Sequence, residues 1–388
     1  TLQRFLFAGY GSVLYISKVF WPFGLTAFHP YPSLVDNGTR LPYVYYIAPV
    51  LSFLLFGGAL LFWKRFKVIV FGLFFYLINV ALVLQFVSVG SAIYSERYTY
   101  MAYIGLFIII AYYLALLVEQ RKKVRKPIYL LVAVICLFLS WLTIQQVQMW
   151  KDSLTLWQKF NQEYPECNHG DYKIAEHYMD AGENQKALDH FIMMTDKYSV
   201  AAKAYMGAGN MLGKMGKPQE ALIYFNKAEE RYIEGGSMEN LWVNRAISYS
   251  MLKQYDKALK DYARALEYDP NSIRIYIDRG YSYLEYGSVE KAIDDFNNAI
   301  RLDPTNGRAY FMRALAYHRS NNIEMAILEY GNVLKLQPNN ADVYHNRAIC
   351  YETQKKYKEA LADINMAKQL GKAENQAYIN KLKVLSSQ

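Results

Sequence analysis

Cysteine is scarce and dispersed in this chain of 388 residues. Cys136, Cys167 and Cys350 lie far apart, and no two of them have the spacing of a zinc-ligand motif. Glycine-rich phosphate loops, paired zinc-binding histidines and nucleophile-elbow motifs are also missing. The six histidines have no regular spacing. These absences argue against a disulfide framework or a structural zinc site, and we expect no metal ligands.

Acidic residues are rare in the first 149 positions, which hold 3 of the 34 Asp and Glu residues but 12 of the 43 Lys and Arg residues. The net charge of +9 therefore belongs to this part, because the remaining 31 basic and 31 acidic residues cancel. Binding a phosphate backbone needs a surplus of Lys and Arg on one face. The neutral second part therefore predicts no nucleic-acid partner.

Long apolar runs fill the basic part. Four of them are long enough to cross a bilayer, which takes about 20 helical residues. A fifth, weaker run contains Lys18, which must snorkel or pair. A buried core helix would explain a single run, but several in succession favour a polytopic membrane domain. We predict this domain over residues 1–149, with spans at 5–23, 43–63, 68–89, 100–118 and 127–147.

Lys and Arg residues cluster in two loops of this domain, 64–67 and 121–126. An even number of crossings separates the loops, so they share a side, which the positive-inside rule makes cytoplasmic. Residues 24–42, residues 90–99 and everything after residue 147 are then extracytoplasmic, and in a bacterium the protein lies in the inner membrane. Because the chain begins at Thr1 and enters a span directly, we expect it to be the C-terminal portion of a longer protein.

Residues 168–388 repeat with a period of 34. Small residues recur at two positions, an aromatic residue lies between them, and proline follows, which is the tetratricopeptide repeat (TPR) signature. The positions are Ala246, Gly280, Ala314 and Ala348; Tyr249, Tyr283, Tyr317 and Tyr351; Ala258, Ala292, Ala326 and Ala360; and Pro270, Pro304 and Pro338. Small residues let the two helices of a unit approach, and proline ends the second helix. We therefore predict an all-α fold, in which a polytopic transmembrane bundle, a connector over 150–167 and a TPR solenoid of about six repeats with a closing helix follow one another.

A TPR solenoid is a superhelix with a concave face lined by the first helix of each repeat. Such surfaces usually bind protein or peptide segments, although a spacer with an unused groove is the alternative. The repeat pattern predicts the groove residues Arg274, Ile277, Tyr281, Arg308, Phe311, Leu315, His318, Asp342, His345 and Ile349. Their mixed charges form no concentrated basic clamp, so a C-terminal carboxylate ligand is not favoured.

One charged pair, Glu96 and Arg97, lies among tyrosines between two apolar runs. A snorkelling pair within an interfacial tyrosine belt explains it without any function. Alternatively, the planar fork of Arg97 suits the phosphate of a membrane lipid.

The stretches KVFWPFGLTAFHPYPS (18–33) and YSERYTYMAYIGLF (94–107), with the basic loop, last span and TPR units that follow, carry a family resemblance. They resemble the C-terminal part of bacterial relatives of the transmembrane and TPR-repeat-containing protein O-mannosyltransferases. Such GT-C-type glycosyltransferases move a sugar from a polyprenyl-phosphate carrier to an acceptor outside the cytoplasm. The resemblance implies that Arg97 contacts the carrier phosphate, that Glu96 orients Arg97, that His29 and Tyr31 line the same cavity, and that the TPR array recruits the acceptor protein.

The catalytic carboxylate of this family usually lies in the first extracytoplasmic loop. Within the predicted membrane domain, the acidic residues outside the cytoplasm are Asp36 and Glu96, and neither is in that position. We therefore expect the base to lie upstream of Thr1, and this chain not to catalyse by itself. Polyprenyl-phosphate sugar would be the donor of an enzyme, and no other cofactor is predicted. The alternative is a non-enzymatic, membrane-anchored TPR scaffold for protein-protein interaction.

Overall fold

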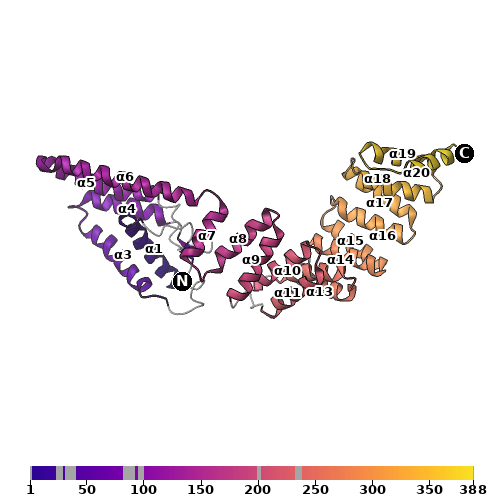
Figure 1. Cartoon of the computed structure of the whole chain (residues 1–388), viewed down its shortest axis with the longest axis horizontal. Helices are drawn as coiled ribbons and strands as arrows, with labels where there is room; N and C mark the ends of the chain where they lie inside the picture. Colours follow the sequence, from indigo (N-terminus) through magenta and orange to yellow (C-terminus); the bar gives the residue numbers. More distant parts are fainter. Residues whose placement is uncertain are drawn as a thin grey trace. The chain divides into compact units, whose positions relative to one another are not determined.

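A computed structural model describes residues 2–22, 29–30, 41–81, 92–94, 100–198, 202–231 and 238–387 of the chain. The chain forms two compact units, Thr1–Ser199 and Val200–Gln388. In the described ranges every element is helical except one short pair of strands (Figure 1). The predicted all-α class is therefore confirmed.

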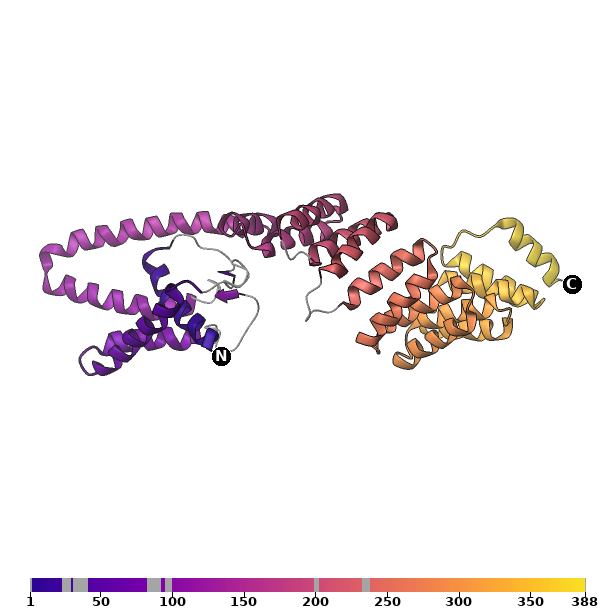
Figure 2. The ribbon, with the colours of Figure 1, turned by 90° about the horizontal axis from the view of Figure 1, so that it is seen from below.

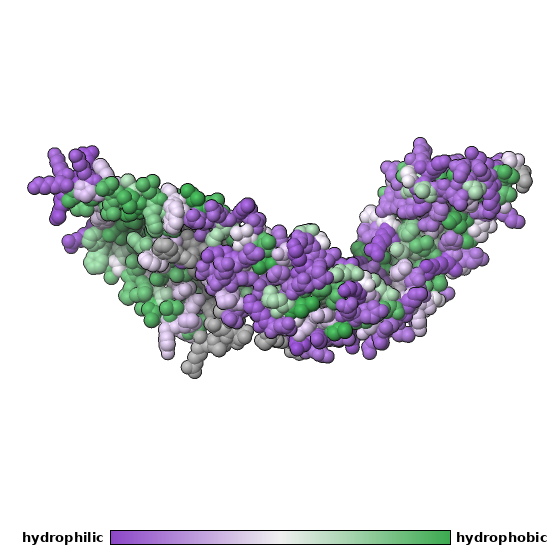
Figure 3. Space-filling view, in the orientation of Figure 1, coloured by the Kyte–Doolittle hydropathy of each residue, from purple (hydrophilic) through white to green (hydrophobic). Residues whose placement is uncertain are grey.

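Apolar helices make up the first part of the first unit. They are α1 (Leu2–Phe20), α3 (Val44–Leu61), α4 (Lys67–Ala81), α5 (Tyr100–Gln120) and α6 (Arg125–Met149), with a 3-10 turn, η2 (Lys122–Val124), before α6. Among the described residues, three segments are long and apolar enough to cross a membrane, namely α3, α5 and the stretch Lys122–Met149. Hydrophobic side chains dominate this part of the surface in Figure 3, whereas the basic connection around η2 is hydrophilic.

Two predicted spans differ from the helices found. The run at 5–23 forms α1, which carries Arg4 and Lys18 and is not among the three segments apolar enough to cross. The run at 68–89 is described only as far as Ala81, where α4 is a shorter apolar helix. The two basic loops are separated by two helices, α4 and α5. The prediction that both loops lie on the same side therefore does not depend on α1.

Small residues set the closest helix contacts in this bundle. A Cβ atom added to Gly72 of α4 would collide with the carbonyl oxygen of Gly105 in α5. One added to Gly9 of α1 would lie 2.5 Å from the ring of Pro49 in α3. Glycine therefore lets both pairs of backbones approach, as small residues do between membrane helices.

A pair of strands joins two loops of the first unit. Strand β1 (His29–Pro30) is antiparallel to β2 (Ala92–Tyr94), and His29 lies opposite Tyr94. His29 is buried, and its Nδ1 atom lies 2.5 Å from the hydroxyl of Tyr164, just after α7 (Ser153–Glu163). The loop charges predict that residues 24–42, residues 90–99 and the chain after residue 147 lie on one side of a membrane. These contacts join all three segments.

In the part of the chain that the structure describes, six helix pairs follow α7. The two helices of a pair run antiparallel (Figure 2). The first pair belongs to the first unit and the other five to the second. The pairs are α8 (Asn168–Asp180) and α9 (Asn184–Lys197), α10 (Ala202–Lys214) and α11 (Pro218–Glu230), α12 (Glu239–Met251) and α13 (Tyr255–Tyr268), α14 (Ile273–Tyr286) and α15 (Val289–Leu302), α16 (Gly307–Arg319) and α17 (Ile323–Leu336), and α18 (Ala341–Thr353) and α19 (Tyr357–Gln369), before the closing helix α20 (Gln376–Ser386).

The repeat positions account for the geometry within each pair. A Cβ atom on Gly280 of α14 would lie 2.6 Å from the ring of Phe296 in α15, so glycine permits this helix contact. The turns between paired helices contain one residue each with positive φ: Gly182, Gly216, Lys253, Gly287, Asn321 and Lys355. Glycine adopts this conformation freely, whereas Lys253 and Lys355 carry a Cβ atom that makes it unfavourable.

An arginine on the first helix and a carboxylate on the second recur in the last four pairs. These ion pairs are Arg245–Asp261, Arg279–Asp295, Arg313–Glu329 and Arg347–Asp363, with N–O distances of 2.7–2.8 Å. All four carboxylates are buried, so the pairing satisfies charges that would otherwise be costly inside the solenoid. The partners keep the 34-residue period, but sequence analysis did not identify them.

Candidate functional site

A cavity of about 610 Å³ opens on the second unit, between α12, the start of α13, α14 and α16. We call it the α14 cavity, because α14 provides five of its lining residues. These residues are Ile247, Ser250, Met251, Lys253, Tyr255, Tyr262, Arg274, Asp278, Tyr281, Ser282, Glu285 and Arg308. The cavity thus combines charged, hydroxyl and aromatic side chains from three successive helix pairs.

Asp278 lies between two arginines in this cavity. The Nη2 group of Arg308 donates a hydrogen bond of 3.0 Å to Oδ1 of Asp278, and Nε of Arg274 lies 3.6 Å from Oδ2. The side chain of Asp278 is 15% exposed, whereas those of Arg274 and Arg308 are 60% and 59% exposed. Burial raises the pKa of Asp278, and the two arginines oppose that shift. The side chain of Asp278 is therefore mostly covered, whereas both arginine side chains are mostly exposed.

An aromatic and thioether surface adjoins these charges. Tyr281 and Met251 are 44% and 50% exposed, although both are large and apolar enough to favour burial. Beneath them, the hydroxyls of Ser250 and Ser282 hydrogen-bond at 2.9 Å and join α12 to α14. Burial is the main cause that raises the pKa of Tyr281, so this phenol stays neutral at physiological pH. The exposed ring and thioether offer a contact surface for an apolar group.

Three of the ten predicted groove residues, Arg274, Tyr281 and Arg308, line the α14 cavity. The structure corrects the assignment of Ile277, which is 3% exposed and packs with Ala299 and Ala309. It shares a helix face with Arg274 and Tyr281, but the next helix pair covers it.

The other six predicted groove residues lie outside the α14 cavity. Asp342 pairs with Lys372, and Nδ1 of His345 lies 2.7 Å from Glu374. These two partners precede α20, so the closing segment occupies the charged groups at that end of the solenoid. Burial lowers the pKa of His318. The six residues are Phe311, Leu315, His318, Asp342, His345 and Ile349.

Sequence reasoning missed Asp278, Glu285 and the end of α12 around Met251. Asp278 follows Arg274 by four residues, a spacing that places both on one helix face and could have indicated the pair. No sequence signal shows that Met251 reaches α14, because this contact depends on how successive helix pairs pack.

Of the residues that the family resemblance assigns to a lipid-carrier cavity, only His29 is described. It is buried and contacts Tyr164. Tyr31, Glu96 and Arg97 lie outside the described residues. Within the described ranges, no group of three or more His, Cys, Asp or Glu residues could hold a metal ion.

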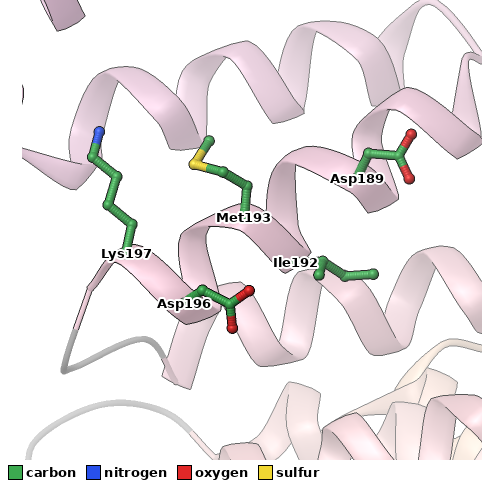
Figure 4. Close-up of a pocket in the computed structure, with 5 residues that line it drawn as sticks. All are labelled: Asp189, Ile192, Met193, Asp196 and Lys197. Carbon is green, nitrogen blue, oxygen red and sulfur yellow. The ribbon is translucent and has the colours of Figure 1, made fainter.

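A second hollow, of about 640 Å³, lies along α9. Figure 4 shows that its five lining side chains, Asp189, Ile192, Met193, Asp196 and Lys197, all come from this one helix. Because no described side chain from another helix lines it, this hollow is an open helix surface and a weaker candidate than the α14 cavity.

Comparison with known families identifies the helix pairs. Residues 172–235 and 246–316 match families described as tetratricopeptide repeat, and residues 315–355 match one described as TPR repeat. These helix pairs are tetratricopeptide repeats. The α14 cavity is therefore built by the third, fourth and fifth TPRs, chiefly from their first helices.

Several solved TPR proteins are similar to this chain. One is YrrB, described as a TPR protein with an unusual peptide-binding site, with 24% identity over 49% of this chain and 96% of that chain, at a TM-score of 0.42. Another is MamA from Desulfovibrio magneticus RS-1, with 20% identity over 44% and 94%, at 0.40. A TPR protein from Parabacteroides merdae has 19% identity over 56% and 98%, at 0.42. No curated protein matches the chain.

Proposed function

We propose that this chain is a membrane-anchored TPR protein whose α14 cavity binds a segment of a partner protein. The observation that carries the proposal is the convergence of exposed Arg274, Tyr281, Arg308 and Met251 on one cavity. Exposed aromatic, thioether and arginine side chains are the types enriched at protein interfaces. A solenoid that served only as a spacer would not need them in one place.

Photo-crosslinking in cells tests this binding. A benzoylphenylalanine placed at Tyr281 should crosslink to a partner protein, because this side chain faces the cavity. The matched control is Leu328, a comparably exposed residue on α17 that does not line the cavity. Equal crosslinking from both positions, or none from position 281, would overturn the proposal.

The membrane anchor that we propose consists of α3, α4, α5 and α6. Of these, α3, α5 and the stretch Lys122–Met149 are long and apolar enough to cross a membrane, and α4 is a shorter apolar helix. No residue of α6 is buried, so side chains such as Leu130, Leu137 and Ile144 stay exposed on its surface. Covering one such side chain is worth about 1.5–3 kcal/mol, which a lipid bilayer would supply along the whole helix. The basic cluster before α6 then lies in the cytoplasm and the TPRs outside it.

Reporter fusions test this topology. Alkaline phosphatase, which is active only outside the cytoplasm, should be active when fused after Gln388 and inactive when fused after Lys123. The reverse pattern would refute the orientation. Activity at neither position, with the protein found in the soluble fraction, would refute the anchor itself.

We further propose that the full-length protein transfers a sugar from a polyprenyl-phosphate carrier to a protein that the TPRs recruit. The support is the family resemblance over residues 18–33 and 94–107, together with the position of His29 beside Tyr164, where the last apolar helix leads into the TPRs. Arg97→Ala should abolish transfer and leave the abundance of the protein unchanged. Unaltered transfer would remove the role of Arg97. A non-enzymatic scaffold would instead crosslink from position 281 and transfer no sugar.

A further inference from the structure

The charges around the α14 cavity define the class of group that it accepts. We propose that Arg274 and Arg308 together bind the side-chain carboxylate of an Asp or Glu residue in the partner segment. This inference rests on the proposed peptide-binding function and adds the chemistry of the ligand.

Positive charge exceeds negative charge at this site. The cavity is lined by Lys253, Arg274 and Arg308 against Asp278 and Glu285. Glu285 is already paired at 2.7 Å with an arginine of α16, Arg319. Asp278 remains as the one carboxylate that Arg274 and Arg308 share in the cavity. Arg274 and Arg308 together therefore keep one positive charge beyond that of Asp278, and Lys253 adds a second.

The geometry gives a ligand access to that charge. A guanidinium group carries five N–H donors, and Arg308 donates one of its Nη2 protons to Asp278. Arg274 approaches Asp278 through Nε, at 3.6 Å, and its side chain is 60% exposed. Because Asp278 is covered and both arginines are mostly exposed, a second carboxylate meets the guanidinium groups before it meets Asp278.

The residue next to the acidic one is expected to be apolar or aromatic. Tyr281 and Met251 expose a ring and a thioether in the same cavity. Burying them under a ligand side chain removes apolar area from water, which stabilises the complex. An acidic residue flanked by an apolar one therefore fits the site better than an acidic residue alone.

Selection from a random peptide library tests the proposal. Phage-displayed peptides are fused ahead of the coat protein and have no free carboxyl terminus, so any selected carboxylate must be a side chain. Selection on the full chain in detergent should enrich Asp or Glu beside an aromatic or apolar residue. Peptides without acidic enrichment would overturn this inference and leave the proposed function standing, whereas the absence of any binding peptide would overturn both.

Fluorescence anisotropy with one selected peptide then measures the contribution of the carboxylate. Replacing its Glu by Gln should weaken binding about tenfold at low salt, as expected for losing a hydrogen bond to a charged group. Arg308→Gln should weaken the Glu peptide by a similar factor and the Gln peptide little. Arg301→Gln, at an exposed arginine of α15 outside the cavity, is the matched control and should change neither.

Asp278→Asn separates ligand binding from a structural role. Because Asp278 competes with the ligand for both arginines, this variant should bind the Glu peptide several-fold more tightly. Weaker binding, with an unchanged circular dichroism melting curve, would contradict this competition and overturn the proposed carboxylate site. This test and the peptide substitution hold even if Arg308→Gln fails to fold.

Discussion

Replacing Arg245 by Met should strongly destabilise the third TPR. The guanidinium of Arg245 donates two hydrogen bonds to Asp261, at 2.7 and 3.0 Å, and two to Glu229, at 2.5 and 3.1 Å. The side chains of Arg245 and Asp261 are only 6% and 5% exposed. The substitution therefore leaves the buried carboxylate of Asp261 with only the longer ion pair to Arg264, at 3.8 Å. Removing one partner of a buried ion pair costs about 3–5 kcal/mol.

Hydrogen exchange read by mass spectrometry resolves this loss along the chain. Amides in α12 and α13 should exchange on the order of 100-fold faster or more in Arg245→Met, because the free energy of their local opening falls by about 3–5 kcal/mol. Amides in α18 and α19 should change little, since repeats interact mainly with their neighbours.

Two control variants test whether the buried charge left on Asp261 causes the faster exchange. The double variant Arg245→Met with Asp261→Leu should recover most of the protection, because it removes both buried charges. Arg301→Met, at an exposed arginine, should change stability by less than about 0.5 kcal/mol. The reasoning is refuted if Arg245→Met exchanges like Arg301→Met, or if the double variant is no better protected than the single one.

Three further predictions concern the repeats. Gly280→Ala places a Cβ atom 2.6 Å from the ring of Phe296 and should cost about 1–3 kcal/mol, seen as a lower thermal unfolding midpoint; an unchanged midpoint would mean that the helices separate freely. Lys355→Gly relieves a φ of 58° and should raise the midpoint, by about 1 kcal/mol of stability, whereas a lower midpoint would count against strain at this turn. Burial raises the pKa of Glu229, but hydrogen bonds from Arg245 and Trp242 bring this pKa below the ordinary 4.5. The ionised Glu229 therefore stabilises the fold above pH 4.5, and this stabilisation is lost as the pH falls through the lower pKa of the folded state. Exchange in α11 and α12 should then accelerate on acidification, and less so in a Glu229→Gln variant.

The 34-residue period predicted which positions are small. Only a small side chain fits where the two helices of a pair are in close contact. Ala258, Ala292 and Gly280 are all buried where two helices of a pair meet. This contact lies within one repeat, so a sequence pattern is sufficient to identify it. The class of fold and the helix pairing follow from such local rules.

The contents of the groove were harder to predict because they depend on contacts between repeats. Ile277, Arg274 and Tyr281 have the spacing of a single helix face, yet Ala309 of the next pair covers only Ile277. Likewise, Met251 reaches the cavity through the packing of α12 on α14. The rotation between repeats decides both outcomes, and no single repeat encodes that rotation.

The buried ion pairs show a different limit. Arg279 and Asp295 keep the repeat period, but charged residues on a solenoid are expected at its surface. Their burial becomes apparent only when the two helices are placed together, with Nη2 of Arg279 2.7 Å from Oδ1 of Asp295. Periodic charges of opposite sign, 16 residues apart, are a signal that could have revealed them.

Hydroxyl-radical footprinting of the full chain, with and without a selected peptide, tests most directly whether the α14 cavity holds a partner segment. Oxidation of Tyr281 and Met251 should fall when the peptide binds, because both are exposed in the cavity. Oxidation of Tyr268 and Met366, exposed on second helices outside it, should stay constant. Protection of Tyr268 or Met366, with Tyr281 and Met251 unprotected, would contradict a binding site in the α14 cavity.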